Sequence, residues 1–167
     1  LHLNKFYINT SIMCGILAIL LKKNNEISED IRKNMLAMSR NIRHRGPDAN
    51  GFIETKNGIF LHERLSIIDP FGGSQPINYQ NNDQHLILSV NGEIYNHKEI
   101  REELKNRDYS NHYCKKYHQY KFMTGSDCEV INSLYIDEKM ESKSPNGLLS
   151  QEQIYEIMSK LDGQFSF

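Results

Sequence analysis

The stretch MCGILAILL, residues 13–21, sets the frame of the fold. Its apolar run from Gly15 to Leu21 is unbroken and of strand length, so the pattern predicts a buried β-strand. Polar residues 22–27 follow and predict a turn. Ser28, with two acidic residues directly after it, predicts the start of a helix, and Gly46-Pro47 predicts its end. The first structural unit of the sequence is therefore a strand followed by a helix.

Short strands and helices are predicted along the rest of the chain. Further strands are expected at residues 59–61, 65–68, 85–90 and from 165 onward. Helix starts are expected at Asn96 and at the capping boxes 126–129 and 150–153. Between these elements, residues 70–76 predict a loop and Asn91-Gly92 predicts a turn. Because strands and helices are grouped rather than strictly alternating, their order favours an α+β layered fold.

Two polar stretches are predicted to be surface insertions, at residues 106–120 and 137–147. The first contains His112, Cys114 and His118, which could be considered as metal ligands, but their spacing matches no standard zinc pattern. It also interleaves lysines with tyrosines, as nucleic-acid-binding patches do. A solvated loop is the simpler interpretation, so we expect neither a metal site nor nucleic-acid binding.

Composition narrows the class of protein. The 167 residues suit one domain, and 38% hydrophobic residues can supply a core. A formal net charge of −1 gives no general attraction to nucleic acid or to anionic lipid, and no apolar run is long enough to span a membrane. The three cysteines, Cys14, Cys114 and Cys128, are odd in number and lack a CxxC pair, which favours a reducing, cytoplasmic compartment.

Five short motifs occur in a fixed order along the chain. They are MCGI (13–16), RHRGPD (43–48), HERLSIID (62–69), NGEIYNH (91–97) and GSDCE (125–129). Together they resemble the class II glutamine amidotransferases, and the residues within each motif are similar to those of the asparagine synthetase branch. The resemblance runs from Met13 to Phe167 apart from the two insertions. It implies an N-terminal-nucleophile hydrolase fold, a four-layer αββα sandwich of two antiparallel sheets, here cut short at its C-terminus.

Cys14 is the candidate nucleophile. A structural role is the usual one for a free cysteine, but Met13 directly before a small residue is the pattern that removal of an initiator Met requires. Removal would leave Cys14 at the terminus, where its own α-amine, with a pKa of roughly 8, can take the thiol proton. The resemblance implies this mechanism, and it requires no His or Asp partner.

The remaining candidate residues fit the needs of a glutamine substrate. Attack on the amide builds negative charge on its oxygen, which Asn91 and the backbone N–H of Gly92 can stabilise; a plain hairpin turn is the alternative. Arg64 can hold the α-carboxylate, or form a surface salt bridge. The resemblance implies that Glu93 and Asp127 hold the α-ammonium. It further implies that Leu65, Ile67 and Ile68 line the pocket and that Arg45 has a supporting role.

The resemblance also implies a larger enzyme. We expect residues 14–167 to be the glutaminase domain, incomplete at its C-terminus, and residues 1–13 to be an extension or processed segment. L-glutamine is the expected substrate, with no cofactor in this domain. A synthetase domain absent from this chain is expected to use ATP and Mg to make asparagine. The oligomeric state is left open, with a homodimer as one option. Alternatives are another class II amidotransferase or, if the extension is retained, a non-catalytic glutamine-binding domain.

Overall fold

The computed structural model describes residues 13–22, 26–81, 85–108, 119–142 and 148–167. The chain divides into two compact units, Leu1–Leu65 and Ser66–Phe167, and each is described here by itself. His112, Cys114 and His118, together with the segment before Met13, lie outside the described residues.

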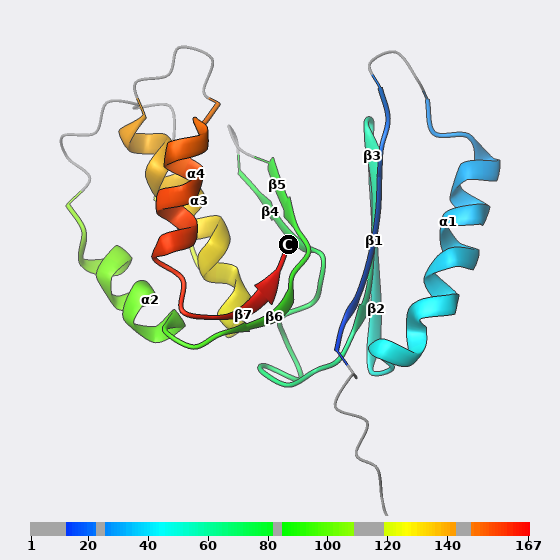
Figure 1. Ribbon diagram of the computed structural model, residues 1–167, viewed down its shortest axis with the longest axis horizontal. Coiled ribbons are helices and arrows are strands. Elements are labelled where there is room, and N and C mark those ends of the chain that lie inside the picture. The colour runs from blue at the N-terminus through cyan, green and yellow to red at the C-terminus, as the bar shows by residue number, and fades with distance from the viewer. Residues whose placement is uncertain (1–12, 23–25, 82–84, 109–118, 143–147) are drawn as a thin grey trace, which may run out of the picture. The chain divides into compact units, whose positions relative to one another are not determined.

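The first unit is a three-stranded antiparallel sheet with one helix packed on it (Figure 1). Its strands are β1 (Gly15–Leu20), β2 (Ala49–Thr55) and β3 (Gly58–Arg64), in the order β1-β3-β2. Helix α1 (Glu29–Ile42) begins where it was predicted, because the Ser28 side chain accepts a hydrogen bond from the N–H of Ile31. Apolar side chains of α1 and β3 form the core of this unit, with Met35, Ile59 and Leu61 buried.

The second unit contains two antiparallel strand pairs. Strand β4 (Ile77–Gln80) pairs with β5 (His85–Leu88), and β6 (Asn91–Ile94) pairs with β7 (Gly163–Ser166). The second pair joins residues about 70 positions apart, so it brings the last described residues beside the centre of the sequence.

Three α-helices pack against these strands (Figure 1). They are α2 (His97–Asn106), α3 (Val130–Glu141) and α4 (Gln151–Ser159). A short 3₁₀ turn, η2 (Asp127–Glu129), leads into α3, as η1 (Arg43–Arg45) follows α1. Buried apolar residues from all three helices share one core with those of β4, β5 and β6. The capping box predicted at residues 150–153 is confirmed at the start of α4.

Several local predictions are wrong. Residues 65–68 form no strand, because β3 already ends at Arg64. Asn91-Gly92 is not a hairpin turn but the first half of β6, since β7 supplies a pairing partner that no local pattern reveals. Strands β2 and β4 were not expected. β2 is an edge strand whose side chains alternate between half-buried and exposed, which leaves only a weak apolar signal.

The predicted capping box at residues 126–129 is also wrong. Ser126 caps nothing with its side chain, and Glu129 is used elsewhere. Asn96 stands at the start of α2 but likewise makes no capping bond there; its side chain bonds the backbone of Lys160 and Asp162.

Some of the described residues of the two predicted insertions are packed rather than exposed, while residues 109–118 and 143–147 lie outside the described residues. Tyr120, Asp137 and Met140 are buried, and Tyr120 and Met140 share a hydrophobic cluster with Tyr79 and Ile136. These residues therefore belong to the packed unit rather than to a surface loop.

The architecture confirms the α+β class, with antiparallel strands and helices in both units. No helix within the described ranges is long and apolar enough to cross a membrane.

Candidate active site

Cys14 lies immediately before β1, and the backbone of Leu65 holds its sulfur. The N–H of Leu65 donates to Cys14 Sγ over 3.3 Å, and the thiol faces the Leu65 carbonyl at 3.7 Å. The antiparallel register of β1 and β3, with Gly15 opposite Glu63, places the start of one strand beside the end of the other. Sheet pairing therefore brings together two residues that are 51 positions apart.

The segment carrying Arg45 and Gly46 packs against the same end of the sheet. Arg45 Nε donates to the carbonyl of Cys14 over 3.4 Å, and the N–H of Asp48 donates to the carbonyl of Arg64 over 3.1 Å. A Cβ at position 46 would meet the backbone of Glu63 and Arg64 at less than 3.0 Å, so only glycine permits this approach. Arg45, to which the resemblance gives a supporting role, thus contacts the backbone of Cys14.

Arg64 and Glu63 follow each other at the end of β3, so their side chains point to opposite faces of the sheet. Glu63 accepts a hydrogen bond from Ser39 of α1. Arg64 is only 7% exposed, which does not fit the solvent-exposed salt bridge considered as its alternative role.

Burial raises the pKa of the Cys14 thiol above its ordinary value. The hydrogen bond from Leu65 and the positive charges of Arg64 and Arg45 act in the opposite direction but do not reverse the shift. In a chain that retains Met13, Cys14 is therefore a weaker source of thiolate than an ordinary cysteine. Burial, with the charge of Arg64 as a smaller cause, also lowers the pKa of His62 to about 4, so this imidazole is neutral at physiological pH.

In the second unit, Asn91, Gly92 and Glu93 are consecutive residues of β6 and pair with β7. Gly92 has a φ of 148°, and a Cβ there would meet the backbone of Gln164 and Phe165 at less than 3.0 Å. Both facts require glycine at this position. The side-chain Oδ1 of Asn91 is buried and has no hydrogen-bond partner among the described residues.

Asp127 is tied directly to this strand. Its Oδ2 accepts a hydrogen bond from the N–H of Ile94 over 2.7 Å, and its side chain is 3% exposed. The next residue, Cys128, directs its thiol to the Gly92 carbonyl at 3.7 Å. The structure thus brings Asp127 beside the strand that carries Asn91, Gly92 and Glu93.

The predicted site residues fall into two groups, one in each unit. Cys14, Arg45, Arg64 and Leu65 belong to the first unit, and the others belong to the second. Of the two predicted lining residues in the second unit, Ile67 is 60% exposed and Ile68 is half-buried.

Asp69 was not singled out from the sequence, although it ends one of the five motifs. It has a φ of 54°, and its two carboxylate oxygens accept hydrogen bonds from the N–H groups of Gly72 and Gly125. The local signal was Asp followed three residues later by Gly, which is typical of a side-chain-stabilised turn. The bond to Gly125 has no local signal.

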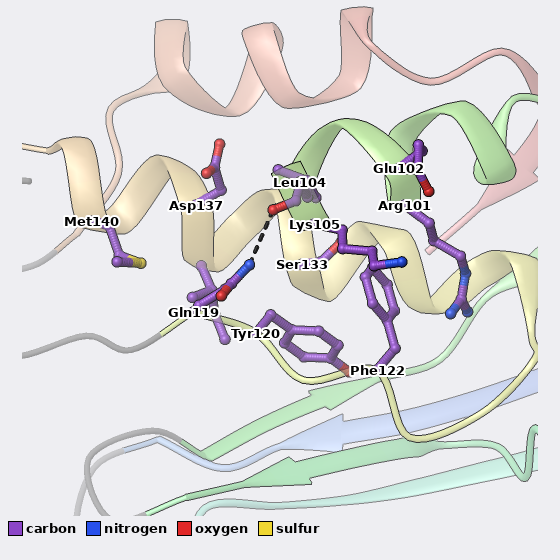
Figure 2. Close-up of a pocket in the computed structure, with 11 residues that line it drawn as sticks. Arg101, Glu102, Leu104, Lys105, Gln119, Tyr120, Phe122, Ser133, Asp137 and Met140 are labelled. Atoms are coloured by element: carbon purple, nitrogen blue, oxygen red, sulfur yellow. Dashed lines mark hydrogen bonds between the residues drawn. The ribbon is translucent and has the colours of Figure 1, made fainter. Parts of the chain in front are cut away.

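A cavity of about 320 Å³ lies in the second unit between α2, α3 and residues 119–122 (Figure 2). Tyr120, Leu104 and Asp137 help to line it, and Gln119 bonds the Leu104 carbonyl across its wall. None of the predicted glutamine-binding residues lines this cavity, so it is not the candidate site. Over the described ranges, no group of three or more His, Cys, Asp or Glu side chains is placed to hold a metal ion.

Comparison with known proteins agrees with this arrangement of motifs. The family model described as a glutamine amidotransferase domain matches residues 13–144, which include Cys14 and every other candidate residue. The chain belongs to the glutamine amidotransferase family. The family match begins at Met13, directly before the candidate nucleophile.

The curated relatives of this chain include glutamine-hydrolysing asparagine synthetases of plants. The chain is 39% identical to asparagine synthetase 1 and 42% identical to asparagine synthetase 2 of Arabidopsis thaliana, and 39% identical to the Zea mays enzyme. Each match covers 155 residues, which is 93% of this chain but 21% of the relative. The chain thus spans about a fifth of the length of the curated relatives it matches.

Proposed function

We propose that this amidotransferase domain hydrolyses L-glutamine to glutamate and ammonia through a γ-glutamyl thioester on Cys14. The observation that carries the proposal is the position of the Cys14 sulfur. It stands directly before β1, is held by the N–H of Leu65, and lies near Arg64 and Arg45, whose positive charges partly offset the rise in pKa that burial causes. A cysteine of this kind, one peptide bond from a removable Met, suits an N-terminal nucleophile.

The proposed reaction balances without an external reagent other than water. The α-amine of Cys14 takes the thiol proton, and the sulfur attacks the side-chain amide carbon of glutamine. The C–N bond breaks, and the leaving nitrogen takes that proton and departs as ammonia. Water then attacks the thioester, which releases glutamate and restores the thiol. The α-amine can act only after Met13 is removed, since an amide nitrogen is no longer a base.

The other residues receive roles that follow from their chemistry. Asn91 and the N–H of Gly92 stabilise the charge that develops on the amide oxygen. Arg64 binds the α-carboxylate through two parallel hydrogen bonds. Glu93 and Asp127 bind the α-ammonium, while Leu65, Ile67 and Ile68 line the pocket. Arg45 supports the nucleophile through its contact with the Cys14 carbonyl.

We also propose the wider setting that the plant relatives suggest. In it, residues 14–167 form the glutaminase part of an asparagine synthetase, with the four-layer αββα sandwich as its fold and residues 1–13 as a processed segment. A separate synthetase domain uses the ammonia with ATP, Mg and aspartate to make asparagine. The location is cytoplasmic. The relatives' names, with the identity over 93% of this chain, support this proposal.

The test compares three versions of the full natural chain. One keeps residues 1–13, one begins at Cys14, and one begins at position 14 with Cys14→Ala. We expect glutamate release from the second version only, and ammonia-dependent asparagine formation from all three, because that chemistry belongs to the other domain. Intact mass spectrometry establishes where each protein begins.

Two outcomes contradict the proposal. Equal glutamate release with the extension still attached would exclude the α-amine as the base. Glutamine binding without hydrolysis in every version would indicate a non-catalytic binding domain. Transfer of the ammonia to an acceptor other than aspartate would instead identify a different class II amidotransferase.

A further inference from the structure

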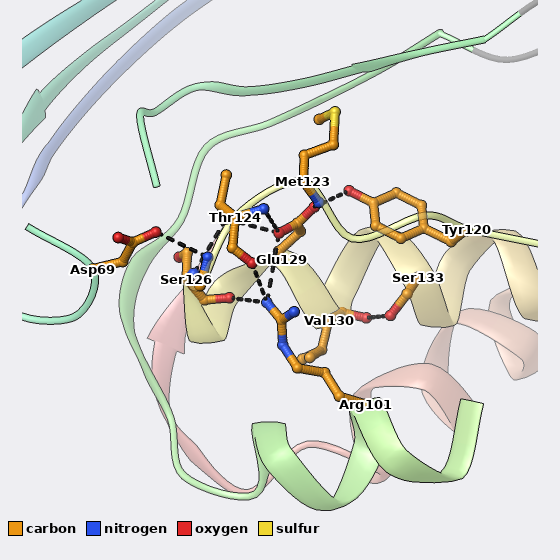
Figure 3. Close-up of polar contacts among 10 residues, drawn as sticks. Asp69, Arg101, Tyr120, Met123, Thr124, Ser126, Glu129, Val130 and Ser133 are labelled. Carbon is orange, nitrogen blue, oxygen red and sulfur yellow. Dashed lines mark hydrogen bonds and ion pairs between the residues drawn. The ribbon is translucent and has the colours of Figure 1, made fainter. Parts of the chain in front are cut away.

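The carboxylate of Glu129 is completely buried and yet has no place in the proposed reaction. Five donors surround its two oxygens (Figure 3). Oε1 accepts from the Tyr120 hydroxyl over 2.9 Å and from the N–H of Met123 over 2.6 Å. Oε2 accepts from the N–H and hydroxyl of Thr124 over 2.9 and 2.7 Å, and Arg101 lies 3.5 Å away. A buried charge with this many donors is a strong anchor.

These bonds fix a loop residue by residue. The N–H groups of Met123 and Thr124 go to opposite oxygens of Glu129. The N–H of Gly125 goes to Asp69, and that of Ser126 goes to the Thr124 hydroxyl, which itself donates to Glu129. Every backbone N–H from 123 to 126 therefore ends on a side chain rather than in a helix or sheet.

Arg101 holds the carbonyl side of the same loop. Its guanidinium donates to the carbonyls of Thr124 and Ser126 over 3.1 and 2.7 Å, and it lies over the ring of Phe122 at 4.1 Å. It also supplies the positive charge nearest to Glu129. The loop is thus held from both sides by one ion pair, in which Glu129 is buried and Arg101 is partly buried.

The loop leads directly into Asp127, whose carboxylate bonds the N–H of Ile94 in β6. The position of Asp127 therefore depends on the loop before it and on the 3₁₀ turn that ends at Glu129 itself. Since β6 carries Asn91, Gly92 and Glu93, this network joins the two elements of the second unit to which substrate binding is assigned.

We infer that Glu129 is a positioning residue for recognition of the α-ammonium of the substrate, acting through the 123–126 loop on Asp127. The inference rests on the proposed function, because Asp127 is assigned to the ammonium there. The chemistry demands a carboxylate. In Glu129→Gln the amide NH₂ would face one of the two backbone N–H groups whichever way the side chain turned. One N–H···O hydrogen bond would therefore be replaced by two donors that repel each other.

The test measures binding of L-glutamate and of glutarate, which differ only in the α-ammonium, by calorimetry on the full natural chain. In Glu129→Gln we expect the Kd of L-glutamate to rise about tenfold and that of glutarate to change less than twofold. Asp127→Asn should show the same selectivity, and the double variant should be no more than twofold worse than Asp127→Asn, because both changes act on one contact.

Matched controls separate positioning from stability. Glu138→Gln makes the same chemical change on α3, where Glu138 accepts a hydrogen bond from the Gln153 side chain, and should leave both affinities unchanged. If Glu129→Gln does not fold, Thr124→Val removes the hydroxyl that donates to Glu129 and accepts from the Ser126 N–H, and it keeps the bonds from the N–H groups of residues 123 and 124 to Glu129. It should weaken L-glutamate about threefold and leave glutarate unchanged.

Equal losses for the two ligands would overturn the inference, because a general loss of structure does not distinguish them. Additive losses in the double variant would do the same, as would a wild-type protein that fails to bind L-glutamate. A protein that binds L-glutamate with this selectivity but releases no glutamate from glutamine would contradict the proposed function and leave the role of Glu129 standing.

Discussion

Replacing Gly92 by Ala tests the geometry of β6 directly. A Cβ at this position would approach the backbone of Gln164 and Phe165 to less than 3.0 Å, a separation that side chains essentially never show. The φ of 148° adds a second penalty, because residues other than glycine rarely adopt it. Neither obstacle can be relieved by a side-chain rotation, since the neighbouring atoms are backbone.

The magnitude follows from these two terms. An unfavourable backbone conformation costs about 1–3 kcal/mol, and overpacking costs roughly the same again. Opening of the β6–β7 pair should therefore become easier by at least about 2 kcal/mol, or roughly 30-fold. Native-state hydrogen exchange of the amides in β6 and β7 measures this opening locally.

Gly125→Ala is the matched control. A Cβ at Gly125 comes no closer than 3.4 Å to Asp69, which is ordinary contact, and its φ is not in the glycine region. Exchange of the β6 and β7 amides should stay within about threefold of wild type. Unchanged protection in Gly92→Ala, or an equal loss in Gly125→Ala, would refute the reasoning.

Two further predictions concern the first unit. Arg64→Lys should lower kcat/KM for glutamine at least roughly tenfold, or about 1.4 kcal/mol, because lysine cannot make the bidentate contact; an unchanged steady-state value would remove Arg64 from the site. In the chain that retains residues 1–13, burial raises the pKa of the Cys14 thiol. The rate of its alkylation by iodoacetamide should therefore rise with pH, with a midpoint above the pKa of roughly 8.5 of an ordinary thiol. Arg45→Met should move that midpoint to a higher pH, because the charge of Arg45 lowers the pKa of Cys14. Mass spectrometry of the alkylated protein across a pH series measures both midpoints. A wild-type midpoint at or below that of an ordinary thiol would contradict the burial argument.

Features that depend on neighbouring residues were predictable. The strand after Cys14, the Ser28 cap and the capping box at 150–153 each depend on contacts within a few positions, and each is confirmed. The α+β class followed from the grouping of such elements. The candidate residues could likewise be named from the sequence, because five motifs occur together in a fixed order.

Features that depend on partners outside a short motif were not predictable. Glu129 matched a capping box, but Tyr120 and the N–H groups of residues 123 and 124 supply more donors than a helix start does. Gly92 matched a hairpin turn, yet β7 draws it into a strand. In both cases a local preference of about 1 kcal/mol was outweighed by hydrogen bonds to residues outside the short motif.

The sequence by itself determined the family and the candidate residues, because nucleophiles, donors and charges are properties of single side chains and short motifs. Only the tertiary structure decided their surroundings. It set the Cys14 sulfur against Leu65, bonded Asp127 to Ile94, and surrounded Glu129 with donors. The physical reason is that burial and hydrogen-bond partners arise when strands and loops far apart in the chain pack together, and no short pattern encodes that packing.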